Sequence, residues 1–224
     1  MANPYRNTFA LTAAVTNGIS VSQSLAGAGN LTITGSLASG GVATLTSTNC
    51  TARRVGITSA GNDSGMMWTI TGTDRTGKPQ SESFAGGNVA AVQSAKDYAT
   101  ITKIAGSAAT ASTVTAGTTA QGSTEWRQLD FYRENFNVGM GVAIASGSLT
   151  YSVEYTFDDP NAALPGSLEP NSAQPPLATA FAGWSALTTS NAGANIIPLF
   201  AVRMTITAGT GTGVFSIIQT GIGS

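Results

Sequence analysis

Hydrophobic and polar residues alternate in short segments along this chain, and helical spacing is nearly absent. A period of two places successive side chains on opposite faces of a strand, and its recurrence about every eight to twelve residues is typical of a sandwich or barrel. The sequence therefore predicts an all-β fold. The predicted strands comprise residues 9–15, 19–25, 31–34, 42–48, 53–59, 66–73, 80–84, 98–104, 112–116, 126–133, 138–145, 149–157, 201–207 and 214–219.

The first half contains its clearest strand pattern at residues 66–73. Met66, Trp68 and Ile70 fall on one face of this segment, and threonines fall on the other. We therefore expect the face with the large side chains to be buried.

The second half contains an equally regular strand at residues 149–157. Its hydrophobic residues share one face, and Thr, Ser and Glu share the other. The residues expected on the buried face are Leu149, Tyr151, Val153, Tyr155 and Phe157. A turn at residues 146–147 and a glycine-rich hairpin connection at 208–213 are predicted from their composition.

Two further segments indicate how the chain is divided. Residues 117–123 are polar and contain two glycines, which predicts a linker or long turn. We therefore expect two β-sandwich or barrel-like domains, of residues 1–122 and 123–224. Prolines interrupt the alternation between residues 158 and 184, which predicts an extended proline-rich excursion on the surface of the second domain.

The composition argues against enzymatic chemistry. The 224 residues include no histidine, and only 9% are charged. Histidine is the side chain most often used for proton transfer and metal binding near neutral pH, so its absence removes most familiar catalytic arrangements. Cys50 is the only cysteine, which excludes a disulfide within the chain, and we interpret it as a passive small residue. We expect no enzymatic activity and no cofactor or metal.

Charge and hydropathy indicate which partners to expect. The net charge is −1 and the ten basic residues are scattered, so we do not expect binding to nucleic acid. No run approaches the ~20 apolar residues that a spanning helix needs, and no cleavable signal is recognisable, so we expect no membrane partner. A nearly neutral chain with so few charges is prone to self-association, which makes copies of itself the first expected partner.

Some acidic residues leave a catalytic or metal-binding alternative open. Asp158 and Asp159 are adjacent and follow Glu154, an arrangement compatible with a calcium site or an acid–base pair. A glycosidase needs no histidine, so the carboxylates around the 66–73 strand, Asp63 among them, leave this activity as an alternative. Aspartates at strand ends more often bond to the backbone of their own turn, so we favour that interpretation. For Trp184 two interpretations stay open: a place in the core, or a role in stacking against a sugar ring.

Several segments resemble small virion proteins of tailed bacteriophages. In the first half the resemblance is carried by RRVGITSAGNDSGMMWTITGTDRTGKP at 53–79 and SESF at 81–84. In the second half it is carried by LTYSVEYTFDDP at 149–160, Trp184, IPLFAVRMTITAG at 197–209 and FSIIQ at 215–219. These stretches cover about half of the chain and contain no catalytic signature.

The resemblance implies a non-enzymatic structural protein of the virion, assembled in the bacterial cytoplasm. We expect a capsid decoration or cement protein in symmetric copies, because a weakly charged module gains stability by burying surface against repeated neighbours. Its expected partners are its own copies and virion proteins such as the major capsid protein or tail proteins. A tail-tube, collar or head-to-tail adaptor component is the alternative, and a carbohydrate- or receptor-binding module is a further one.

The residues expected to contact partners lie in an N-terminal arm and in the proline-rich excursion. Peripheral, irregular segments of this kind often connect one subunit to the next. The expected contact residues are Ala2, Tyr5, Arg6, Pro160, Leu164, Pro165, Leu168, Pro170, Pro175 and Pro176.

Overall fold

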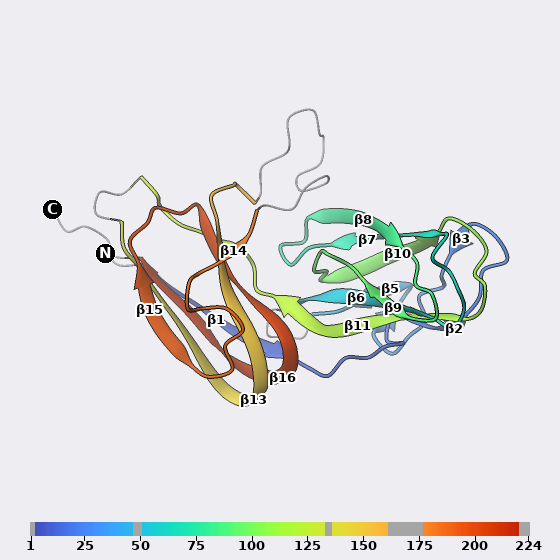
Figure 1. Cartoon of the computed structure of the whole chain (residues 1–224), viewed down its shortest axis with the longest axis horizontal. Helices are drawn as coiled ribbons and strands as arrows, with labels where there is room; N and C mark the ends of the chain where they lie inside the picture. Colours follow the sequence, from blue (N-terminus) through green and yellow to red (C-terminus); the bar gives the residue numbers. More distant parts are fainter. Residues whose placement is uncertain (1–2, 47–50, 133–135, 161–176, 220–224) are drawn as a thin grey trace. The chain divides into compact units, whose positions relative to one another are not determined.

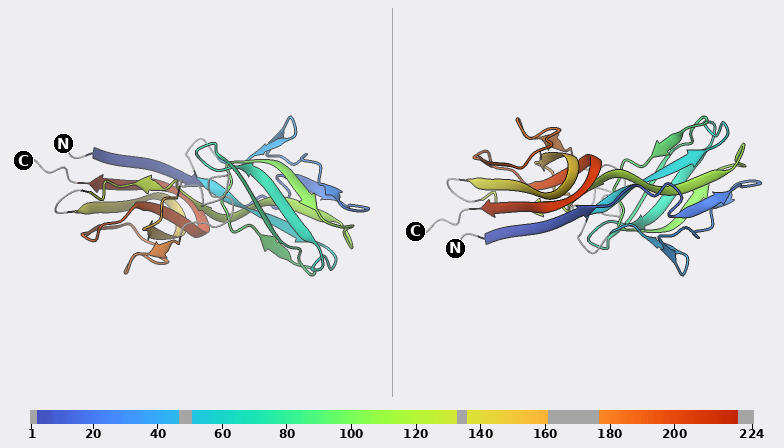
Figure 2. Two further views of the ribbon diagram at one scale, coloured as in Figure 1. Left: turned by 90° about the horizontal axis from the view of Figure 1, so that it is seen from above. Right: turned by 90° about the horizontal axis from the view of Figure 1, so that it is seen from below.

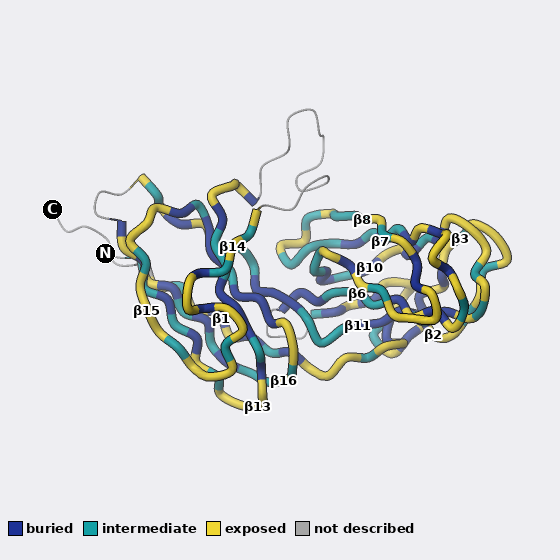
Figure 3. Tube along the Cα trace, in the orientation of Figure 1, coloured by how far each residue is buried: buried dark blue, intermediate teal, exposed yellow. Residues whose placement is uncertain are grey.

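The computed structural model describes residues 3–46, 51–132, 136–160 and 177–219 (Figure 1). The described residues form strands, turns and loops without a helix, and the strands build antiparallel sheets. The prediction of an all-β fold with two sandwich-like units is confirmed. Buried positions are concentrated in the strands, and most connecting loops are exposed (Figure 3).

The chain divides into two compact units, and the division is not a simple cut in the sequence. Unit 1 comprises Met1–Thr12, Asn49–Thr51 and Ser123–Ser224, and unit 2 comprises Ala13–Thr48 and Ala52–Gly122. The expected boundary between residues 122 and 123 coincides with one of these limits. The first twelve residues, however, belong to the unit that contains the C-terminal half, because the first strand pairs with the last.

Unit 2 is a sandwich of two antiparallel sheets. One sheet contains β2 (Ser20–Gln23), β6 (Ala52–Ser59), β9 (Ala91–Gln93) and β11 (Val114–Ser123), in the order β2-β11-β6-β9. The other has the order β4-β5-β10-β7-β8, with β3 also paired to β10. Its strands are β3 (Gly29–Asn30), β4 (Ala38–Ser39), β5 (Val42–Thr44), β7 (Met67–Thr73), β8 (Pro79–Ala85) and β10 (Thr100–Gly106).

The alternation in β7 produces the buried face that the sequence predicts. Met66, Trp68 and Ile70 are all buried, and Trp68 lies opposite Phe84 of β8 in the antiparallel ladder. The turn after β7 is closed by Asp74, whose Oδ1 accepts hydrogen bonds from the backbone N–H groups of Thr76 and Lys78. Asp74 therefore bonds to the backbone of its own turn, as expected of aspartates at strand ends.

The predicted linker at residues 117–123 is wrong, because these residues continue strand β11. Thr118 is buried, its hydroxyl oxygen accepts a hydrogen bond from the Val15 N–H, and its own N–H donates to the Val15 carbonyl. Hydroxyls satisfied in this way are compatible with a buried strand. Polar composition alone therefore misidentified the segment as a loop.

Unit 1 is built around two long strands, β13 (Val138–Thr156) and β16 (Ala201–Gln219), which are paired antiparallel along their length. β1 (Asn3–Leu11) and β15 (Asn191–Asn195) flank one half of this pair, in the order β1-β16-β13-β15. β12 (Arg127–Gln128) and β14 (Thr179–Ala180) flank the other half.

The turn predicted at residues 146–147 and the hairpin connection predicted at 208–213 are wrong, because these residues lie inside β13 and β16 and pair with each other. Both strands curve together at this point (Figure 1), and the ladder is interrupted by shifts after Ile144 and Thr150. Gly209 has a φ of 87°, and a Cβ there would lie 2.0 Å from the Ser148 carbonyl oxygen. The glycines thus allow two backbones to bend in close contact, as strands do at the corners of sandwiches.

The core of unit 1 lies between the two halves of the bent pair. Leu149, Tyr151 and Val153 are fully buried there, as their alternation predicts, whereas Phe157 at the end of that face is 63% exposed. Trp184 is buried in the same cluster, so it belongs to the core. β1 contributes Phe9 and Leu11.

Candidate interaction surface

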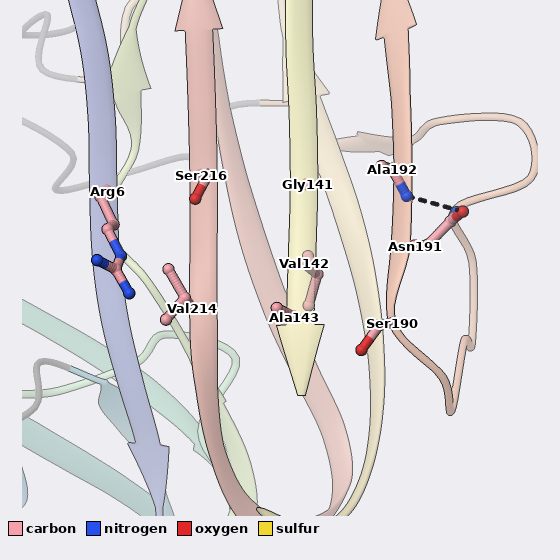
Figure 4. Close-up of a pocket in the computed structure, with 9 residues that line it drawn as sticks. All are labelled: Arg6, Gly141, Val142, Ala143, Ser190, Asn191, Ala192, Val214 and Ser216. Carbon is pink, nitrogen blue, oxygen red and sulfur yellow. Dashed lines mark hydrogen bonds between the residues drawn. The ribbon is translucent and has the colours of Figure 1, made fainter. Parts of the chain in front are cut away.

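Unit 1 presents a sheet face of small side chains over four strands (Figure 4). The ladders place Arg6 of β1 beside Ser216 of β16, Ser216 beside Gly141 of β13, and Gly141 beside Ala192 of β15. Because side chains alternate along each strand, these residues point away from the core that Phe215 and Met140 enter. We call this the outer face; solvated faces of antiparallel sheets are usually polar, and this one is dominated by Gly, Ala and Ser.

A shallow depression of about 650 Å³ lies on the outer face. Its lining residues are Arg6, Gly141, Val142, Ala143, Ser190, Asn191, Ala192, Val214 and Ser216. Arg6 is the one charged residue among them, and no carboxylate of the described residues forms an ion pair with it. The Ser190 hydroxyl already accepts the Ile144 N–H at 3.0 Å. The depression therefore provides a concave surface with one positive charge, and its lining contains no pair of acidic and basic side chains.

β1 forms one margin of the outer face. Its nine residues pair with β16 in unbroken register, and no other described strand pairs with its free side (Figure 2). Pro4, Arg6 and Thr8 are exposed, whereas Asn7 is only 7% exposed on the core side. The Asn7 Nδ2 group is buried without a hydrogen-bond partner among the described residues.

The two N-terminal contact residues that are described lie within β1 and not in an irregular arm. Tyr5 is half-buried; its hydroxyl donates to Glu125 Oε1 at 2.5 Å, and the Arg127 guanidinium lies 4.9 Å from its ring centre. Arg6 is exposed and lines the depression. Tyr5 thus holds β1 to its own unit, and Arg6 is the one of the two that is available to a partner.

Most of the remaining expected contact residues lie outside the described ranges. Pro160 is buried at the end of a described segment. Outside the described residues lie Ala2, Leu164, Pro165, Leu168, Pro170, Pro175 and Pro176.

A second polar cluster in unit 1 involves an aromatic ring. Arg203 lies 4.5 Å from the centre of the Trp126 ring and forms an ion pair of 2.9 Å with Glu154. Thr205 also donates to Glu154 at 3.3 Å. Glu154 is therefore engaged by Arg203 and Thr205 and does not join Asp158 and Asp159 in an acidic site.

The carboxylates considered for catalysis bond to backbone and hydroxyl groups. Asp158 Oδ2 accepts the Leu177 N–H at 2.9 Å. Asp63 is buried, with the Ser59 hydroxyl and the Ala111 N–H as donors. No cluster of metal-binding side chains occurs within the described parts of the chain. The outer-face depression has no carboxylate in its lining either.

A cluster of ionisable groups with shifted pKa values lies in unit 2. Glu82 of β8 accepts the backbone N–H groups of Ala95 and Lys96, and burial raises its pKa. Burial also lowers the pKa of Lys96, while Glu82 partly opposes this shift. The pKa of Tyr98 is raised by burial and by the neighbouring Glu82 charge. Glu82 accepts hydrogen bonds from the backbone of Ala95 and Lys96, and it thereby attaches the loop that precedes β10 to strand β8.

Large hydrophobic side chains are exposed mainly near strand ends. The most exposed in unit 1 are Tyr132, Phe157, Leu177, Ile196 and Ile197. A helix of the length and hydrophobicity needed to span a bilayer is absent from the described residues.

Comparison with known proteins gives no relative: no protein-family model, no curated protein and no solved structure matches this chain.

The sequence pointed to Arg6 but missed the surface to which it belongs. Gly139, Gly141 and Ala143 alternate with Val138, Met140 and Val142, which indicates a face of small residues on one strand. That β15 and β1 extend this face could not be read from the pattern, because strand pairing is set by contacts distant in sequence. Asn7 carried no sequence signal at all.

Proposed function

We propose that this chain is a non-enzymatic structural protein of a bacteriophage virion, and that it decorates or cements the capsid in symmetric copies. The observation that carries the proposal is the outer face, a weakly charged sheet surface of small side chains uncovered among the described residues. Small side chains let another backbone approach closely, and one charge keeps the desolvation cost of covering the face low. The phage assignment itself rests on the resemblance of the sequence to virion proteins.

The competing functions have less support. A carbohydrate-binding module would expose the aromatic rings considered for that role, yet Tyr151 and Trp184 are buried in the core and Trp126 is stacked against Arg203. A glycosidase needs two carboxyl groups facing a cleft, and Asp63 and Asp158 instead bond to nearby backbone. The outer face is equally compatible with a tail or collar component, so the copy number in the particle must distinguish such a component from a decoration protein.

The test is to count this chain in purified particles of the source phage by quantitative mass spectrometry. A decoration protein should approach the copy number of the major capsid protein, whereas about six or twelve copies would favour the ring symmetry of a tail or collar. Absence from the particle would overturn the virion proposal.

Particle binding should also depend on the outer face. Ala143→Arg places a large cation on this exposed face, whereas Thr102→Arg places the same side chain on an exposed position of unit 2. We expect the first substitution to reduce binding of the purified chain to particles that lack it by at least about tenfold, because a buried unpaired charge is costly. Thr102→Arg should bind like the unmodified chain.

A further inference from the structure

The free side of β1 presents backbone groups to which a second strand can pair. β1 is nine residues long, its ladder with β16 contains no bulge, and no described strand covers its other side. Natural edge strands are usually short, bulged, or guarded by proline or several charges; β1 has Pro4 near its start and Arg6 as its one charge. An edge of this kind fits an extended strand from another molecule.

A second copy of β1 fits this edge in one register. In an antiparallel pair around a two-fold axis, opposing residues have numbers with a constant sum. A sum of 14 pairs all nine residues from 3 to 11, and every other register leaves some of them unpaired. An odd sum would also join the core-facing side of one sheet to the outer face of the other, which strand alternation disfavours.

The exposed side chains of β1 are compatible with the same register. Arg6 lies opposite Thr8 of the second copy and not opposite another arginine, so like charges are not placed in contact. Asn7 falls on the two-fold axis, with its Nδ2 group buried inside its own unit.

We propose that two copies of this chain associate through their β1 edges, in antiparallel register with Asn7 opposite Asn7. The inference deepens the proposed function, which includes symmetric copies, but its test needs only the purified chain. The contact involves one strand from each molecule and is smaller than a standard interface, so the expected dimer is weak in solution. Repeated copies on a particle would strengthen it by avidity.

Charge substitutions at Thr8 test the register by sedimentation equilibrium. Thr8→Lys places lysine opposite Arg6 of the other copy twice in each dimer, and we expect the dissociation constant to rise about tenfold. Thr8→Glu places a carboxylate there and should lower it several-fold. The double variant Arg6→Glu with Thr8→Lys should restore association.

Ser83 provides the matched control, because it is an exposed hydroxyl residue on β8, the edge strand of a sheet in unit 2. Ser83→Lys and Ser83→Glu should leave the dissociation constant unchanged. Equal effects at Ser83 and Thr8 would overturn the edge assignment, as would an unmodified chain that stays monomeric up to millimolar concentration.

Disulfide trapping tests the same register independently. In a Cys50→Ser background, Arg6→Cys combined with Thr8→Cys should form a dimer under mild oxidation, whereas Arg6→Cys alone should not. Efficient crosslinking by the single variant would overturn the register. A trapped dimer that is absent from phage particles would contradict the virion function and leave the edge pairing intact, and a monomer found in particles would do the reverse.

Discussion

Asn7 shows how one residue can be unfavourable in the isolated chain. Its Nδ2 group is buried without a partner among the described residues, and such a group costs the energy of its lost water contacts. At concentrations below dimer formation, Asn7→Leu should therefore raise the free energy of unfolding by about 1 kcal/mol, measured by chemical denaturation. Asn7→Asp should lower it, because it buries a charge. A loss of stability in the leucine variant would show that the amide has a partner.

Glu82 makes the stability of unit 2 depend on pH. Burial raises its folded-state pKa above the ordinary value near 4.5, so the folded protein binds this proton more tightly than the unfolded chain does. The resulting stabilisation is complete below about pH 4.5 and is lost as pH rises through the folded-state pKa.

Glu82→Gln removes this titration while it keeps the size of the side chain. The unfolding free energy of the unmodified chain, minus that of the variant, should therefore decrease as pH rises from about 4 to 7. Denaturation at a series of pH values measures this difference. Ser83→Ala, at the exposed neighbouring position, should follow the unmodified chain throughout. A difference that is independent of pH would assign Glu82 a purely structural role.

Among the elements, the bend shared by β13 and β16 depends on glycine. A Cβ at Gly209 would lie 2.0 Å from the Ser148 carbonyl oxygen, and the φ of 87° disfavours any other residue. Gly209→Ala should lower the free energy of unfolding by at least about 2 kcal/mol in denaturant titrations. Gly139→Ala, in a straight part of β13 where the nearest atom would be 3.7 Å away, should change it by less than about 0.5 kcal/mol. Equal effects would contradict the close contact.

The same elements show what sequence patterns can and cannot predict. The buried faces around Trp68 and Tyr151 follow directly from alternation, because burial of one sheet face fixes which residues point inward. The bend was mistaken for a hairpin tip, since glycine permits a tight turn and a close approach of two strands alike. The outer face was only partly visible, because Arg6 and Ala192 come to one sheet face through three strand pairings between residues 210, 75 and 51 positions apart in the sequence.

At the scale of the molecule, the first strand completes the unit formed by the last hundred residues. β1 supplies Phe9 and Leu11 to the core of unit 1 and pairs with β16 along nine residues. Residues 13–122 contain all of unit 2, including its complete core cluster, and only Asn49–Thr51 of unit 1. The two units should therefore differ in whether they fold as simple fragments.

A fragment of residues 13–122 should give a dispersed NMR spectrum and a cooperative thermal transition, because its core is intact. A fragment of residues 123–224 should not, because it exposes the apolar surface that β1 covers and leaves half of β16 without its neighbour. Joining residues 1–12 to the end of this fragment through a flexible linker should restore the transition, and the same fusion with Phe9→Asp should not, because it places a charge in the core. A folded 123–224 fragment without β1 would show that the strand is an accessory to unit 1 and not part of its core.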